Sequence, residues 1–218
     1  MNISKAVLSR FINIPNSEKD LRNLLDDIGI EVKRIEQGSA PHLEGDSIFG
    51  VELLANRGDH YCYSGIAREI SGRTGSTLCG PKHEQLQVGS GPSIRIETDL
   101  CLLYSLTLLE LQEEEQASFP SEILRPLHAA GIHSLVPPVD ATNLSNLELG
   151  QPTHVFDADK VVGTVVVRLS TQGERAWPLF KDEKIELPQG IMVIADDEKI
   201  LAIAGVIGCE DSKTTAQT

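Results

Sequence analysis

Three short apolar runs in the C-terminal half constrain the fold most strongly. They are GTVVVRLS at 163–170, IMVIAD at 191–196 and ILAIAG at 200–205, each rich in β-branched residues and bounded by turn-forming residues. Such runs are typical of strands, because β-branched side chains favour extended backbone and turn residues punctuate the pairing. Two weaker runs of this kind, IRIET at 94–98 and LYSLTLLEL at 103–111, precede them. This half of the chain is therefore predicted to be rich in β-structure.

Helical patterns dominate the N-terminal half. Ser4 can cap a short helix, and Ser17 followed by Asp20 precedes leucines at helical spacing until Gly29 ends the run. Strands are predicted over 30–35 and 48–54, followed by a helix that carries a second apolar face, Ile66, Ala67 and Ile70.

The linker-like stretch SGRTGSTLCGPKHEQLQVGSGPS places a domain boundary near residue 90. After it, a helix is predicted to begin near Ser121 and end at Gly131, with Pro126 kinking or shortening it. The sequence thus predicts the α+β class, with a small α/β segment over 1–90 and a larger, β-rich mixed module over 91–218.

Composition excludes several classes of protein. Hydrophobic residues make up 40% of the chain, but no apolar run reaches the ~20 residues of a membrane span, and the N-terminus lacks a secretory signal. We therefore expect a cytoplasmic protein without a membrane partner. Neither the cysteines nor the histidines show the spacing of a metal or disulfide site, so no metal and no cofactor is predicted.

Charge is unevenly distributed along the chain. Residues 1–90 carry 10 basic and 12 acidic groups, a net charge of −2, whereas residues 91–218 carry 9 and 20, a net charge of −11. Nucleic-acid binding normally requires a basic face that releases counterions. Any binding of tRNA or aminoacyl-tRNA by this chain is therefore predicted to be weak.

Several motifs occur in one order along most of the chain. They include DDIGIEVKRIE, the run LLANRGDHYCYSGIARE ending at Glu69, HAAGIHSLVPPVDATN, GQPTHVFDADK and AIAGVIGCEDS. In this order they resemble the N-terminal segment and the central editing region of the bacterial-type phenylalanine–tRNA ligase beta subunit. That family has NRPDCxSxxGIARE, VDxTNYxxxxxGQPxHAFD and IAGVMGG at the corresponding places.

The resemblance implies a site and a reaction. In the family, the central region hydrolyses tyrosine wrongly esterified to the phenylalanine tRNA, which is double-sieve editing by a second pocket. Carried over by motif, His154 of GQPTH is the candidate catalytic residue. The candidate substrate-binding residues are Thr142 and Asn143 of VDATN, with Gly205 and Gly208 of AGVIGC.

The chain also departs from the family pattern. His133 replaces the usual arginine of GIRP, and Cys209 replaces the second glycine of GVxGG, where we expect a bulkier side chain beside the pocket. Only residues 37–52 join the first two motifs, so the tRNA-binding OB-fold domain of the family is missing between them. The chain ends at Thr218, before the family's glutamate for the tyrosine hydroxyl and its C-terminal domains.

Plainer interpretations remain open for the same residues. His154 can be a structural or surface-loop histidine, and Thr142 and Asn143 can bond local backbone. Gly205 and Gly208 can serve a tight turn. We expect capping and loop roles rather than paired-carboxylate catalysis for the nearby acidic residues Asp140, Asp157 and Asp159.

Three functions follow from these alternatives. The first is a beta-chain-like domain protein of the phenylalanyl-tRNA synthetase family, without aminoacylation activity of its own. The second is a free-standing trans-editing hydrolase of aminoacyl-tRNA esters. The third is a non-catalytic module that uses the old pocket to bind a small molecule or a protein partner.

Overall fold

The computed structural model describes residues 1–80, 91–110 and 119–218. They form two compact units. Unit 1 comprises Met1–Glu84 and Ala117–Thr153, and unit 2 comprises Gln85–Gln116 and His154–Thr218. The boundary predicted near residue 90 lies outside the described residues, and the packing groups 117–153 with the N-terminal segment rather than with the C-terminal strands.

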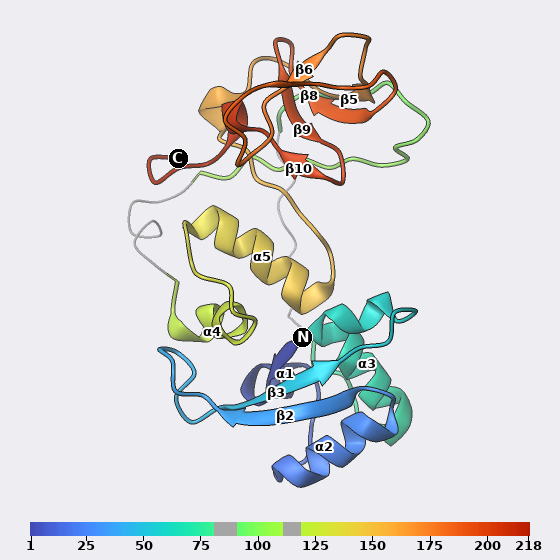
Figure 1. Ribbon diagram of the computed structural model, residues 1–218, viewed down its shortest axis with the longest axis vertical. Helices are drawn as coiled ribbons and strands as arrows, with labels where there is room; N and C mark the ends of the chain where they lie inside the picture. The colour runs from blue at the N-terminus through green and yellow to red at the C-terminus, as the bar shows by residue number, and fades with distance from the viewer. Residues whose placement is uncertain (81–90, 111–118) are drawn as a thin grey trace. The chain divides into compact units, whose positions relative to one another are not determined.

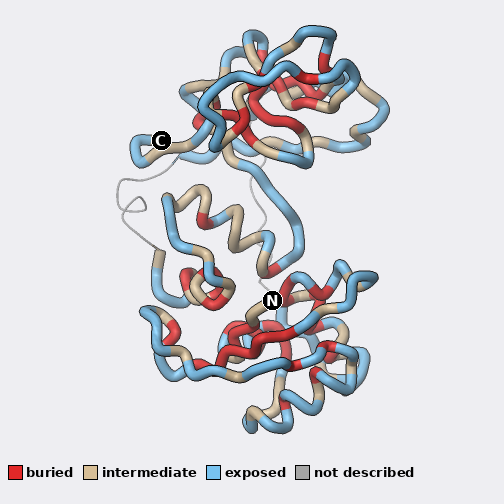
Figure 2. Tube along the Cα trace, viewed as in Figure 1, coloured by how far each residue is buried: buried red, intermediate tan, exposed pale blue. Residues whose placement is uncertain are grey.

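A three-stranded antiparallel sheet is the centre of unit 1. Its order is β1 (Asn2–Ser4), β3 (Ser47–Glu52) and β2 (Glu31–Gln37). The central strand, β3, is buried along almost its whole length, whereas β2 is mostly exposed (Figure 2). In the register, Phe49 lies opposite both Ile3 and Ile35, so one apolar column crosses the sheet.

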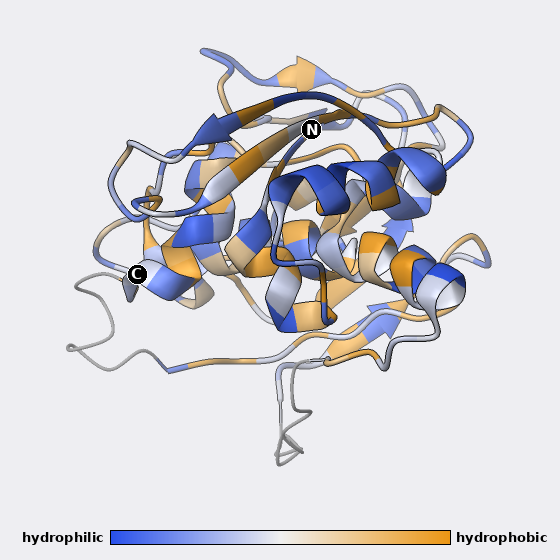
Figure 3. Ribbon diagram, turned by 90° about the horizontal axis from the view of Figure 1, so that it is seen from below, coloured by the Kyte–Doolittle hydropathy of each residue, from blue (hydrophilic) through white to orange (hydrophobic). Residues whose placement is uncertain are grey.

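Three helices cover this sheet with apolar faces. They are α1 (Lys5–Phe11), α2 (Glu18–Asp27) and α3 (Tyr63–Thr74). Figure 3 shows helices of the chain with hydrophilic and hydrophobic residues on different sides, as expected for half-buried helices. The predicted caps are confirmed, because the Ser4 hydroxyl accepts from Val7 N at 3.0 Å and that of Ser17 from Asp20 N at 3.3 Å.

Two further helices, α4 (Ser121–Ala129) and α5 (Pro137–Leu149), complete unit 1. On α4, Arg125 approaches the buried Asp46 at 3.5 Å, and Ala129 packs in an apolar cluster with Leu43 and Ile48. On α5, Glu148 pairs with Arg10 at 3.0 Å. These contacts are the physical reason why 117–153 belongs with unit 1.

Helix α5 did not follow from the sequence pattern. Its first residues are a Pro-Pro pair, which is favourable in the first turn because those backbone positions have no hydrogen-bond acceptor inside the helix. It ends at Gly150, whose φ of 72° is the left-handed conformation of a helix C-cap. The VDATN motif is therefore helical.

A five-stranded sheet forms the centre of unit 2. Its order is β10 (Ile207–Gly208), β9 (Ile200–Ile203), β8 (Met192–Ala195), β5 (Val165–Leu169) and β4 (Ile94–Ile96), with only the β4–β5 pair parallel. A two-stranded ladder, β6 (Arg175–Ala176) and β7 (Ile185–Glu186), lies in the same unit. Its apolar core consists of Ala176, Leu187, Val193, Ile200, Ile203 and Cys209.

Three strong strand predictions and the IRIET prediction are confirmed by β5, β8, β9 and β4. The strand predicted at 103–111 is wrong for its described part, 103–110, which has no strand pairing. Leu103 and Leu109 are 84% and 70% exposed there. Apolar content alone cannot make a strand without a partner edge. The α+β class is confirmed, and among the described residues no helix is long and apolar enough to cross a membrane.

Candidate functional site

His154 and Gly208 lie against one another in unit 2. Gly208 ends β10, and a methyl group on its Cα would lie 2.3 Å from Cε1 and 2.5 Å from Nε2 of His154. Such distances are far inside van der Waals contact, so this position tolerates no side chain while the imidazole occupies its observed place. The structure therefore brings together two of the residues that the motifs single out.

Phe156 also packs against the imidazole. The rings of His154 and Phe156 meet edge to face, with centroids 4.8 Å apart and planes at 68°. His154 remains exposed at one side, yet this packing removes enough water to lower its pKa below the ordinary value of 6.5. The ring is consequently neutral at pH 7, with one nitrogen as donor and the other as acceptor.

This lowered pKa gives a pH-dependent stability. Because the unfolded chain binds a proton more readily than the folded chain, unit 2 should lose stability as pH falls below about 6.5. The unfolding midpoint, followed by Trp177 fluorescence, should be lower at about pH 5.5 than at about pH 7.5. This decrease should be smaller in His154→Gln than in the unaltered chain. An equal fall in the two proteins would contradict the assignment.

Gly205 and Cys209 have structural places. Gly205, with φ of 71°, forms the turn between β9 and β10, closed by the bond from Val206 N to Ile203 O at 3.0 Å. Its role in binding stays a prediction. The expectation that Cys209 crowds the pocket is wrong: its side chain is 1% exposed and packs in the core of unit 2, because neighbouring residues of an extended chain face opposite sides.

Thr142 and Asn143 lie on α5, in unit 1, half-buried. The Thr142 hydroxyl donates to the backbone oxygen of Val139 at 2.7 Å, which is the local bond that the plainer interpretation expects. His154, Gly205 and Gly208 belong to unit 2. The assembly of all five into one pocket stays a prediction.

Two of the three acidic residues near the motifs, Asp140 and Asp157, act as local acceptors, as predicted, and the role of Asp159 stays a prediction. Asp140 is buried and accepts from Ser134 Oγ at 2.5 Å and Leu135 N at 3.0 Å. Asp157 accepts from the backbone N of Asp159 at 3.2 Å and from the hydroxyl of Thr218 at 3.0 Å. Both carboxylates fix loops beside the motifs.

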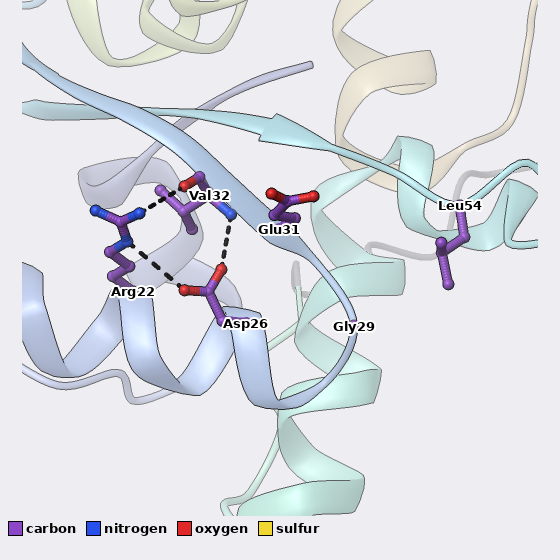
Figure 4. A pocket seen from close by; sticks show the side chains of 6 residues that line it. All are labelled: Arg22, Asp26, Gly29, Glu31, Val32 and Leu54. Carbon is purple, nitrogen blue, oxygen red and sulfur yellow. Dashed lines mark hydrogen bonds and ion pairs between the residues drawn. The ribbon is translucent and has the colours of Figure 1, made fainter.

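A depression between α2 and β2 is held by internal bonds (Figure 4). Arg22 Nη2 donates to Val32 O at 3.1 Å, and Asp26 Oδ1 accepts from Val32 N at 2.8 Å. Arg22 also approaches Asp26 at 3.6 Å. These groups satisfy one another and tie the helix to the strand, so the depression has a structural role.

One cluster of chemistry-bearing residues was missed from the sequence. Asp59, His60 and Glu69 converge beside Arg57 in unit 1. Arg57, Asp59 and Glu69 belong to the NRGDHYCYSGIARE motif, but the cluster contains no pair of histidines or cysteines at metal-ligand spacing. A carboxylate next to a histidine, with a second carboxylate in the following helix, was the available signal.

The chain is similar to a known domain family and to several known proteins. The B3/4 domain family matches residues 103–218. Phenylalanine–tRNA ligase beta subunits of Cupriavidus pinatubonensis and Vibrio parahaemolyticus are 33% and 36% identical over 176 residues, 79% of this chain and 21% and 22% of theirs. That of Aquifex aeolicus is 37% identical over 164 residues, 75% of this chain and 21% of its own. The chain thus spans about a fifth of the length of these relatives.

A solved structure shares the fold. The N-terminal fragment of the phenylalanyl-tRNA synthetase beta subunit from Pyrococcus horikoshii matches with a TM-score of 0.51 and 16% identity, over all of this chain and 65% of that one. The predicted resemblance to beta subunits is confirmed by both kinds of similarity. With more than half of its residues matched, this chain belongs to the B3/4 domain family.

Proposed function

We propose that the His154–Gly208 site recognises and hydrolyses the aminoacyl ester of mischarged tyrosyl-tRNA(Phe). The chain would act as a cytoplasmic, beta-chain-like editing domain with no aminoacylation activity of its own. The observation that carries the proposal is the imidazole of His154 lying on the bare backbone of Gly208. These two residues come from the GQPTH and AGVIGC motifs, which the beta-subunit resemblance links to editing.

The neutral imidazole has the chemistry for this reaction. Its acceptor nitrogen can orient a water molecule whose oxygen attacks the ester carbonyl, and the proton passes to the ribose oxygen as the ester bond breaks. The products are free tyrosine and uncharged tRNA, with no covalent side-chain intermediate. Packing of the ring against Gly208 and Phe156 limits its rotation, which favours one orientation of the water.

The negative charge of the C-terminal half limits which part of a tRNA this chain would bind. With a net charge of −11 over residues 91–218, this half repels phosphates, so recognition would centre on the aminoacyl end. Association with the rest of the tRNA is therefore expected to be weak and salt-dependent. A protein partner would support the binding.

Deacylation of tyrosyl-tRNA(Phe) by the purified chain tests the proposal. We expect hydrolysis above the buffer rate, and a loss of roughly tenfold or more in His154→Ala, because removing a positioned acid–base group costs about 10²–10⁴ in rate. His42→Ala, a histidine of unit 1, is the matched control and should hydrolyse at the unaltered rate.

A non-hydrolysable amide analogue of tyrosyl-adenosine separates binding from catalysis. Binding of the analogue without ester hydrolysis would overturn the hydrolase and leave a binding module that uses the same site. Absence of both would overturn the assignment of the site.

A further inference from the structure

His60 is a buried histidine with both ring nitrogens unpaired. Its side chain is 1% exposed, and neither Nδ1 nor Nε2 has a hydrogen-bond partner among the described residues. Leaving a buried polar atom unpaired costs about 1–3 kcal/mol. A group so placed in a natural core calls for a ligand or a structural explanation.

Two carboxylates face the Nε2 atom of this histidine. Asp59 Oδ2 lies 3.7 Å from it and Glu69 Oε2 lies 3.6 Å from it. Asp59 comes from η1 (Gly58–Tyr61), and Glu69 comes from α3. One ligand atom from each of the three residues lies within 4.8 Å of the others.

We propose that Asp59, His60 and Glu69 form a binding site for a divalent transition-metal ion of the Zn²⁺ class. Two ligands bound at ~2.0–2.2 Å with a tetrahedral ligand–metal–ligand angle of roughly 109° are about 3.4 Å apart. The observed separations of 3.6 and 3.7 Å are slightly longer, so a small inward movement of the carboxylates would complete this geometry. The site takes three protein ligands and leaves a fourth position open to water.

The ligand set selects the kind of metal. An imidazole nitrogen with two carboxylates suits Zn²⁺ and its first-row neighbours, whereas Mg²⁺ prefers oxygen ligands and keeps its waters. Asp59 and Glu69 are 44% and 35% exposed, so an ion can reach the buried nitrogen from the solvent side. Both carboxylates are ionised at neutral pH, since Arg57 lowers their pKa, that of Asp59 to about 2.

Arg57 is the cation that holds these oxygens when no metal is bound. Its Nη2 donates to Asp59 Oδ2 at 2.8 Å and to Glu69 Oε2 at 2.5 Å. Its Nε donates to the other oxygen, Asp59 Oδ1, at 3.0 Å. A metal would take the two oxygens that share Nη2, and the guanidinium, 30% exposed, would turn towards solvent.

Backbone packing fixes the ligands in advance. The amide of His60 donates to Arg57 O at 3.1 Å, which closes the turn that carries Asp59 and His60. Gly65, in the first turn of α3, allows the backbone oxygen of Asp59 to lie where a Cβ would otherwise be, 1.7 Å away. The turn and α3 are therefore held in one arrangement.

Calorimetric titration of the full, EDTA-treated chain with ZnCl₂ tests this proposal. A background with Cys79→Ser and Cys101→Ser removes the two thiols that are not buried. We expect one Zn²⁺ per chain, no response to MgCl₂, and a loss of affinity of roughly tenfold or more in His60→Gln and in Glu69→Gln. Arg57→Gln should raise the affinity several-fold, because it removes the competing cation.

The paired histidines of unit 1 supply the matched control. The rings of His42 and His128 meet edge to face with centroids 4.9 Å apart, and their double change to Gln should leave the titration unaltered. In addition, Zn²⁺ should shift the His60 imidazole resonances in NMR spectra, and Glu69→Gln, at a half-exposed position, should abolish that shift. Binding that survives both His60→Gln and Glu69→Gln, absence of binding, or a fall in affinity in Arg57→Gln would overturn the proposal.

Discussion

Gly65→Ala is expected to destabilise unit 1 by about 3 kcal/mol, the cost of a severe steric overlap in a packed region. The new methyl would lie 1.7 Å from the backbone oxygen of Asp59 and 3.3 Å from Cys62 Sγ. Because the nearest obstacle is backbone, the helix α3 and the preceding turn must separate. Native-state hydrogen exchange of the β3 amides measures the loss directly.

Gly72→Ala is the matched control on the same helix. Gly72 is exposed, and no described atom lies within 4 Å of the methyl that it would gain. Since alanine is favoured over glycine in a helix, this change should stabilise unit 1 by about 0.5–1 kcal/mol. Equal effects of the two changes on stability would show that the close approach at Gly65 does not limit which side chain fits there.

Gly208→Ala is expected to remove the proposed activity and to loosen unit 2. The methyl would lie 2.3 Å from His154 Cε1 and 3.4 Å from Leu179 Cδ1, so the imidazole must leave its place. We expect roughly tenfold or more loss of tyrosyl-ester hydrolysis. A loss of stability of about 1–3 kcal/mol should accompany it. Trp177, the lone tryptophan of the chain, lies in unit 2 and reports that stability by fluorescence.

The NMR resonances of the His154 ring separate this change from the proposed function. They should move in Gly208→Ala even if hydrolysis is absent in the unaltered chain. Gly91→Ala, also in unit 2, is the control, because the described atom nearest to its new methyl is 3.9 Å away. Unmoved His154 resonances in Gly208→Ala would refute the contact that defines the site.

Local signals predicted the elements whose chemistry is local. The two serine caps, the glycine at the end of α2 and the strands β5, β8 and β9 all depend on neighbouring residues, and each was found where the sequence placed it. Helix α5 was missed because its proline pair and its Thr-Asn pair suggest turns. The 103–111 run was overestimated, because a strand depends on a partner that no local pattern shows.

The candidate site likewise combines residues that the sequence predicted with contacts that only the packing reveals. Motif order identified His154 and Gly208, and packing then supplied the contact between them. Cys209 follows Gly208 in the sequence, yet its side chain faces the core. The side that it faces depends on how β10 is oriented in the sheet. The cluster of Asp59, His60 and Glu69 could not be predicted from the sequence, because it depends on the burial of His60 and on the position of α3.

The sequence by itself determined the α+β class, the caps, the strong strands and the resemblance to phenylalanine–tRNA ligase beta subunits, because these depend on residue type, spacing and order. Only the tertiary structure decided that 117–153 packs with the N-terminal sheet, through the Arg125–Asp46 and Arg10–Glu148 pairs. It alone placed an imidazole on a bare glycine and left a buried histidine facing two carboxylates. Such contacts join residues far apart in the chain, and their energies exist only once the backbone has brought them together.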